Sequence, residues 1–187
     1  MPPAPLHFDD ADRILRSSED RPTAYQGREQ NPDGTAHALA RHYLITNAGL
    51  MRRLEEEARN GAIAFFSAFV TRVDMVNAAL EVLNGPAGLW ARTQLFDQAA
   101  TAQRPWGSHT GMRAIIEHQG AWICSARYAG GGPGVMPVGA FRMLLDRVDE
   151  RPHGLHIHTF FPVLTRRPAP GTAEARYKDG RLFGRWP

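Results

Sequence analysis

The order of hydrophobic patterns along this 187-residue chain constrains its fold more than any other feature. Helical patterns lie before Thr110, and segments rich in β-branched and aromatic residues follow it. Two of these later segments are joined by DERPHG (Asp149–Gly154), which is typical of a hairpin with a longer turn. Helices followed by antiparallel strands predict an α+β fold, in which N-terminal helices pack on a C-terminal antiparallel sheet.

The clearest single element is a helix that begins after Thr71. Thr71 and Asp74 have the spacing of a capping box, with Asp in place of the usual Glu, and the helical pattern ends before Gly85. The sequence therefore predicts a helix from about Arg72 to Asn84. Further helices are expected over residues 36–44, 50–59 and 89–96, and strands over 112–118, 121–129, 138–148 and 155–164.

Composition divides the chain into three parts. Residues 1–34 are rich in proline and carry four arginines against seven acids, a net charge of −3, which predicts a leader or linker with one short helix at most, over 9–17. Residues 35–165 form the predicted domain. Residues 166–187 carry five arginines and one lysine against two acids, a net charge of +4, and are expected to form a basic C-terminal tail in which Asp179-Gly180 could turn a small hairpin.

The whole chain has a net charge of +3, and Lys178 is its only lysine. A cationic set made of arginine fits a polyanionic partner, because guanidinium groups contact phosphates in a bidentate manner. A coding bias that replaces lysine by arginine throughout produces the same composition. Without a motif, the charge favours that simpler explanation.

Cys124 is the only cysteine, which excludes an internal disulfide framework and a cysteine-cluster zinc site. No apolar run approaches the roughly 20 residues of a membrane helix, so no membrane insertion by this segment is expected, and the N-terminus lacks the regions of a signal peptide. The Gly-rich loop at Gly130–Gly134 fits neither nucleotide-binding pattern, because Pro133 and Pro137 interrupt it. We expect a soluble domain, compatible with a reducing compartment, that uses no cofactor.

Histidines are the remaining candidates for chemistry. His37 and His42 are five residues apart on one expected helix, so they point about 140° apart and do not chelate one metal ion. His156 and His158 alternate on one expected strand and would face the same side. No third ligand accompanies them, which favours a surface or packing role and predicts no metal site.

Several short segments, taken in order, resemble a known family. They are AHALARHY, the Arg53-Leu54 pair, SAFVTRVDMVNAALEVLN and the HTFFP strand. Their order and spacing resemble the ribonuclease A-like toxin domain at the C-termini of contact-dependent growth inhibition and related polymorphic toxins. The resemblance spans roughly residues 36–163, and residues 89–127 match it least. It implies the ribonuclease A-like toxin fold for the predicted α+β domain.

Matched residue by residue, the resemblance assigns a catalytic site. The family's catalytic histidine falls on His42, its arginine on Arg53 with Arg52 as a neighbour that could contact substrate, and its threonine on Thr159. Its tyrosine falls on Phe161, a departure, because phenylalanine neither donates a proton nor hydrogen-bonds a phosphate. Phe161 could instead stack on a base or pack in the core.

His156 and His158 are natural substitutes for the missing phenol. Thr159 and Phe161 are two residues apart and point the same way on a strand, so regular alternation directs both histidines to the opposite face unless a bulge intervenes. Alternation therefore argues against both.

The resemblance implies a metal-independent ribonuclease. His42 would act as general acid or base, Arg53 would stabilise the phosphorane and Thr159 would donate one hydrogen bond. RNA, with tRNA as one candidate, and a cognate immunity protein would be its partners, and the cytoplasm of a target bacterium its place of action. The alternative, which the Phe161 departure keeps open, is a non-cleaving binding module or an effector with different chemistry, such as nucleotide turnover, on the same fold.

Overall fold

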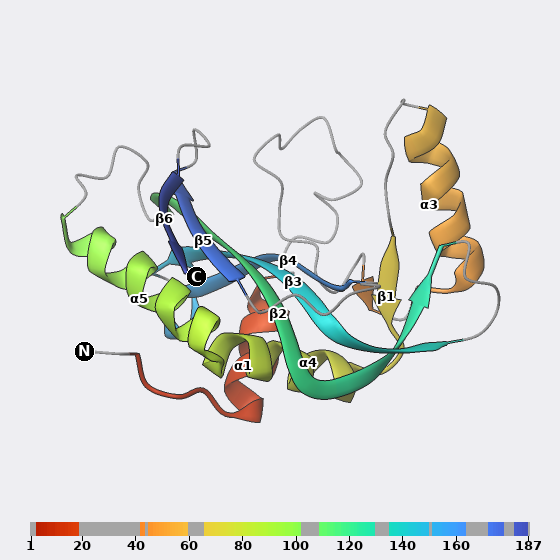
Figure 1. Ribbon diagram of the computed structural model, residues 1–187, viewed down its shortest axis with the longest axis horizontal. Helices are drawn as coiled ribbons and strands as arrows, with labels where there is room; N and C mark the ends of the chain where they lie inside the picture. The colour runs from red at the N-terminus through yellow and green to blue at the C-terminus, as the bar shows by residue number, and fades with distance from the viewer. Residues whose placement is uncertain are drawn as a thin grey trace.

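The computed structural model shows an antiparallel sheet with three of its helices gathered against one face and a further helix, over residues 47–59, standing apart beside the end of the sheet (Figure 1). It describes residues 3–18, 42–43, 45–59, 66–101, 109–129, 135–149, 151–163, 172–177 and 182–186. The helices are α1 (Phe8–Ser17), α3 (Asn47–Arg59), α4 (Arg72–Asn84), α5 (Pro86–Thr101) and the short 3-10 helix η1 (Pro152–Gly154). The strands are β1 (Ser67–Phe69), β2 (His109–Tyr128), β3 (Met136–Val148), β4 (Leu155–Pro162), β5 (Thr172–Tyr177) and β6 (Leu182–Trp186).

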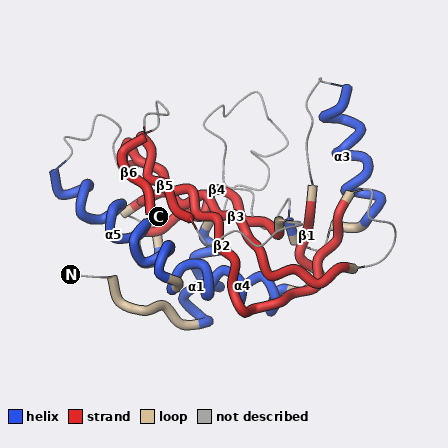
Figure 2. The backbone as a smooth tube through the Cα atoms, in the orientation of Figure 1, coloured by secondary structure: helices blue, strands red, loops and turns tan. Residues whose placement is uncertain are grey.

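The sheet has six strands in the order β4-β3-β2-β5-β6, and β1 pairs with the C-terminal end of β2. All these pairings are antiparallel. Figure 2 shows the resulting separation of helices from strands. The predicted α+β class, with N-terminal helices packed on a C-terminal antiparallel sheet, is confirmed.

The core lies between the sheet and the helices α1, α4 and α5. Alternate residues of the central strands, such as Ile116, Met143 and Ile157, are fully buried there. Phe69, Phe141 and Phe160 pack against one another within it, with ring centroids 5.0 to 6.0 Å apart. The residues that alternate with them along these strands lie on the opposite face of the sheet.

The helix predicted over Arg72–Asn84 is confirmed as α4. Thr71 caps it by accepting a 3.0 Å hydrogen bond from the Asp74 backbone N–H. The helix expected over 50–59 begins earlier, at Asn47, because Thr46 accepts hydrogen bonds from the next turn. The helix expected over 89–96 is the central part of the longer α5, and most of the one expected over 36–44 lies outside the described residues.

The two strands expected over 112–118 and 121–129 are in fact one. β2 continues through Gln119-Gly120, and its pairing with β3 shifts register between Gln119 and Cys124. A glycine inside a strand marks a bend or irregularity as readily as a turn. None of the helices in the described ranges combines the length and the apolar character that spanning a membrane requires.

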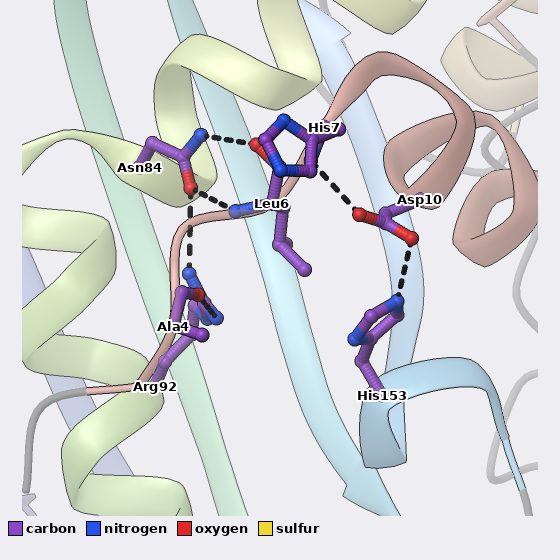
Figure 3. A network of polar contacts seen from close by, with 7 residues as sticks. All are labelled: Ala4, Leu6, His7, Asp10, Asn84, Arg92 and His153. Atoms are coloured by element: carbon purple, nitrogen blue, oxygen red, sulfur yellow. Dashed lines mark hydrogen bonds and ion pairs between the residues drawn. The ribbon is translucent and has the colours of Figure 1, made fainter.

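The N-terminal residues are part of the folded domain. Ala11, Ile14 and Leu15 of α1 are fully buried in the core. The segment before α1 is held by paired hydrogen bonds between the Leu6 backbone and the Asn84 side chain, 3.0 and 2.9 Å long (Figure 3).

A buried arginine extends this contact. Arg92 of α5 donates a 2.7 Å hydrogen bond to the carbonyl oxygen of Ala4, and burial lowers the pKa of the Arg92 guanidinium (Figure 3). The short helix expected over 9–17 is present as α1. The expectation of a leader over 1–34 is wrong for residues 3–18, since the acidic composition of this segment belongs to the exposed side of a helix whose other side is apolar.

The basic C-terminal segment also contributes to the sheet. Residues 172–177 and 182–186 pair as the antiparallel strands β5 and β6, as the small hairpin expected around Asp179-Gly180 requires. Because β5 also pairs with β2, these residues belong to the sheet as well as to the basic segment expected over 166–187. Glu174 binds both Arg176 and Arg185, and the two guanidinium groups lower the pKa of its carboxyl. Part of the excess positive charge of the segment is thus paired with Glu174, by Arg176 within β5 and by Arg185 across to β6.

Because α1 contributes to the core, its apolar side is needed for stability. We expect Ile14→Ala to lower the free energy of unfolding by about 2–5 kcal/mol, since it leaves a cavity under the sheet. Urea unfolding followed by circular dichroism measures the change. Arg13→Ala, on the exposed side of the same helix, is the control and should change it by less than about 0.5 kcal/mol. Equal effects of the two substitutions would contradict the packing of α1.

Candidate active site

His42 is buried beside β1, with 5% of its surface exposed. The next residue, Tyr43, forms an isolated parallel bridge with Phe69 of β1. The Nδ1 atom of His42 lies 2.8 Å from the carbonyl oxygen of Ser67. Because a carbonyl oxygen only accepts, Nδ1 donates this hydrogen bond, and Nε2 is then the basic nitrogen of the neutral ring. The ring is thus oriented in the way that proton transfer requires.

The imidazole stacks on Phe161 of β4. Their ring centroids are 5.0 Å apart and their planes are inclined by 29°. Ser67, whose carbonyl oxygen binds His42, also binds the other partner of this contact. Its hydroxyl donates a 2.6 Å hydrogen bond to the carbonyl oxygen of Pro162 on β4. One residue of β1 therefore holds His42 through its backbone and β4 through its side chain. Two of the predicted site residues, His42 and Phe161, are brought into direct contact.

Thr159 lies two residues before Phe161 on the same strand. Its side chain is 7% exposed, and within the described part of the chain its hydroxyl oxygen has no hydrogen-bond partner. A buried hydroxyl left in this state costs about 1–3 kcal/mol, so such groups are uncommon outside functional sites.

Arg53 and Arg52 have different surroundings on α3. The Arg53 guanidinium carbon lies 4.4 Å from the centroid of the Phe66 ring, and Phe66 directly precedes Ser67. Arg53 is thereby attached to the segment that orients His42. Arg52 has a side chain that is 77% exposed and pairs at 4.0 Å with Glu56 of its own helix. It lies on the solvent side of α3.

Ion pairs follow the sheet face that carries these residues. Arg113 of β2 binds Asp146 of β3 through two hydrogen bonds of 2.8 and 2.7 Å. Arg142, which is opposite Phe161 in the β3–β4 pairing, lies 3.7 Å from Glu117. These side chains alternate with the buried core residues of the same strands, so they lie on the face away from α1, α4 and α5.

The pairing of β4 contains a bulge that regular alternation does not predict. Thr159 is opposite Leu144, whereas Ile157 is opposite Leu145, so His158 is an additional residue. The expectation that His156 and His158 point away from Thr159 and Phe161 rested on unbroken alternation, and the bulge removes its basis.

Ser67 is the residue that sequence reasoning missed at this site. It stands in the SAFVTRVD segment, where an isolated serine inside an apolar run is the only signal. Neither of its two hydrogen bonds follows from a local pattern, because they join it to residues 25 and 95 positions away. Within the described ranges, no three His, Cys, Asp or Glu side chains gather as a metal site would require.

The fold and the site define a class of protein in outline: an α+β domain with an oriented imidazole, a buried hydroxyl that lacks a partner among the described residues, and arginines on the sheet face away from α1, α4 and α5. Such a set suits acid–base chemistry on an anionic substrate.

Comparisons with known proteins add one structural neighbour. Neither a family model nor a curated protein matches the sequence. Among solved structures, the chain is similar to one chain of the crystal structure of a CdiA-CT/CdiI complex from Y. kristensenii, with a TM-score of 0.43 and 18% identity over 66% of this chain and 95% of that chain. At a TM-score below 0.5, the two chains are not shown to share one fold.

The side-chain hydrogen bond of Ser67 predicts the effect of removing its hydroxyl, which leaves the backbone bond to His42 in place. We expect Ser67→Ala to lower the free energy of unfolding by about 1–3 kcal/mol, because the buried Pro162 carbonyl loses its donor. Urea unfolding measures this, and the proton chemical shifts of the His42 ring report on its stacking with Phe161. Ser125→Ala, at a half-buried position on β2, is the control and should change neither quantity appreciably. An unchanged stability of Ser67→Ala would contradict this role.

Proposed function

We propose that this chain is a bacterial toxin or effector domain that cleaves RNA without a metal ion. The observation that carries the proposal is the contact of His42 with β4, where the carbonyl-oriented imidazole stacks on Phe161 two residues from the unpartnered Thr159 hydroxyl. The family resemblance of the sequence points to the same residues. The structural neighbour is not needed for this argument.

The roles of the residues follow from the chemistry of the phosphodiester. Nε2 of His42 accepts the proton of the ribose 2′-hydroxyl while the 2′-oxygen attacks phosphorus. The bond from phosphorus to the 5′-oxygen breaks, a 2′,3′-cyclic phosphate forms, and a proton is delivered to the leaving 5′-oxygen. Arg53 supplies fixed donors to the charged phosphorane oxygens, and Thr159 adds one hydroxyl donor. Phe161 positions the imidazole by stacking and takes no part in proton transfer.

The proposed setting follows from the same family resemblance. A toxin that cleaves RNA, tRNA being one candidate, endangers the cell that makes it, so the chain would be bound by a cognate immunity protein until it acts in the cytoplasm of a target bacterium. Delivery by a contact-dependent growth inhibition system is the form that the resemblance implies.

The proposal predicts that cleavage depends on His42. In EDTA, we expect the purified protein to degrade RNA and His42→Ala to lose 10²–10⁴-fold in rate, because the proton acceptor is removed. RNA fragments with cyclic phosphate ends, resolved by gel and mass spectrometry, are the measurement. His153→Asn is the control: His153 is exposed on η1, has a positive φ that Asn tolerates, and should be replaceable without loss. Equal activity of wild type and His42→Ala would remove His42 from the mechanism.

The second candidate function is a non-cleaving module or an effector with different chemistry. The specific observation in its favour is that Phe161 occupies the position against the imidazole without a hydroxyl group.

Phe161→Tyr separates the two functions. If the site is a silenced nuclease, the variant should gain RNA cleavage that the wild type lacks, because the added phenol can donate a hydrogen bond or a proton. If the wild type already cleaves RNA, the variant should change the rate only moderately. Nucleotide turnover with intact total RNA would instead indicate the different chemistry. RNA cleavage and nucleotide turnover are measured side by side on the same preparations.

A further inference from the structure

The bulge in β4 changes which side chains stand beside Thr159. Between the pairs Leu144–Thr159 and Leu145–Ile157, one strand advances by one residue and the other by two, so His158 and Thr159 share a single partner position. In such a bulge, the additional residue does not alternate to the opposite face.

Burial shows on which face His158 falls. Ile157 and Phe160, on either side of the bulge, are both fully buried in the helix-side core. His158 is only half-buried, like Phe161, and Leu144 opposite the bulge is also half-buried. His158 therefore stands with Thr159 and Phe161 on the face that His42 contacts, so the strand offers a second imidazole at the site.

The bulge is held in place from the edge of the sheet. The Ile157 backbone N–H donates a buried 3.0 Å hydrogen bond to the Ser18 hydroxyl, which in turn donates to the Ile14 carbonyl oxygen at 2.9 Å. Arg151 donates to the Ser17 carbonyl oxygen at 2.6 Å. The C-terminal end of α1 thus fixes β4 directly beside His158. Bulges at such positions are a common means of redirecting a side chain.

His156 is the competing histidine on this strand, and its surroundings differ. It is paired with Asp146, whose carboxylate is bound by both nitrogen donors of Arg113. It also lies farther along β4 from Phe161 than His158 does. The strand pairing places charged and titratable groups on either side of His158: Asp146 opposes His156, and Arg142 opposes Phe161, on which His42 stacks.

We propose that His158 is the second proton-transfer residue of this site, the general acid that protonates the leaving 5′-oxygen while His42 accepts the 2′-hydroxyl proton. This inference rests on the proposed ribonuclease function and gives it the acid that Phe161 does not supply. The proton lost by the 2′-oxygen goes to His42 Nε2, and the 5′-oxygen takes the proton of the His158 imidazolium as its bond to phosphorus breaks. The two imidazoles exchange protonation states in each turnover and are restored through water.

The test separates acid from base by the choice of leaving group. Wild type, His42→Ala, His158→Ala and His158→Gln are assayed in EDTA on an RNA oligonucleotide and on a nucleoside 3′-(4-nitrophenyl phosphate), whose leaving group needs no protonation. We expect the His158 variants to lose 10²–10⁴-fold on RNA and less than about threefold on the nitrophenyl ester. His42→Ala should lose activity on both. His156→Ala is the matched control and should retain activity on both.

The pH profile of kcat/KM provides a second readout. A general acid must be protonated, so wild-type activity on RNA should fall at high pH, and this fall should disappear in the His158 variants. Equal losses on the two substrates, or an unchanged high-pH limb, would show that His158 is not the acid and would overturn the inference. Unfolding midpoints in urea show whether each variant is folded. If His158→Ala is unfolded, the activities of His158→Gln test the inference in its place. Wild-type protein that cleaves neither substrate would overturn the ribonuclease proposal itself, and this inference with it.

Discussion

The mutual packing of three phenylalanine rings supports the rest of the structure. Phe69, Phe141 and Phe160 come from β1, β3 and β4, and their contacts hold these strands together beneath the sheet face that carries His42. Because Phe160 is fixed in the core, its neighbours Thr159 and Phe161 are directed to the other face. Packing on the helix side of the sheet thus fixes the positions of the candidate site residues, which lie on the opposite side.

The sequence predicted those elements whose formation depends on residues close to one another in the chain. The cap at Thr71 located α4, and the change from helical to strand patterns gave the α+β class, because both depend on residues within a few positions of one another. The helix α1 was expected, but its burial was not, since Ala11, Ile14 and Leu15 are few among acidic neighbours. Whether a short apolar stripe on a helix is buried depends on segments that are distant in the sequence.

The site was predictable only in part for the same reason. The resemblance selected His42 and Phe161, which are in contact, and Thr159, which is buried near them. Regular alternation along a strand does not predict the bulge at His158, because the register of β4 depends on its pairing with β3 and on its contact with α1. Ser67 was missed because both of its partners are remote in sequence. Long-range hydrogen bonds leave no local pattern.

The contact between α1 and β4 has a consequence for the order in which the molecule is assembled. Ser18 and Ile157 are separated by 139 positions, so the chain must have been made through Ile157 before this hydrogen bond forms. Contacts of such separation slow folding, because a long loop must close before they contribute. A ribosome-bound chain that has not yet released β4 lacks Thr159, Phe161 and the partner strand of Ser67. During synthesis, His42 and Ser67 therefore leave the ribosome well before the strand that completes their surroundings, and the candidate site is assembled only after β4 has followed them.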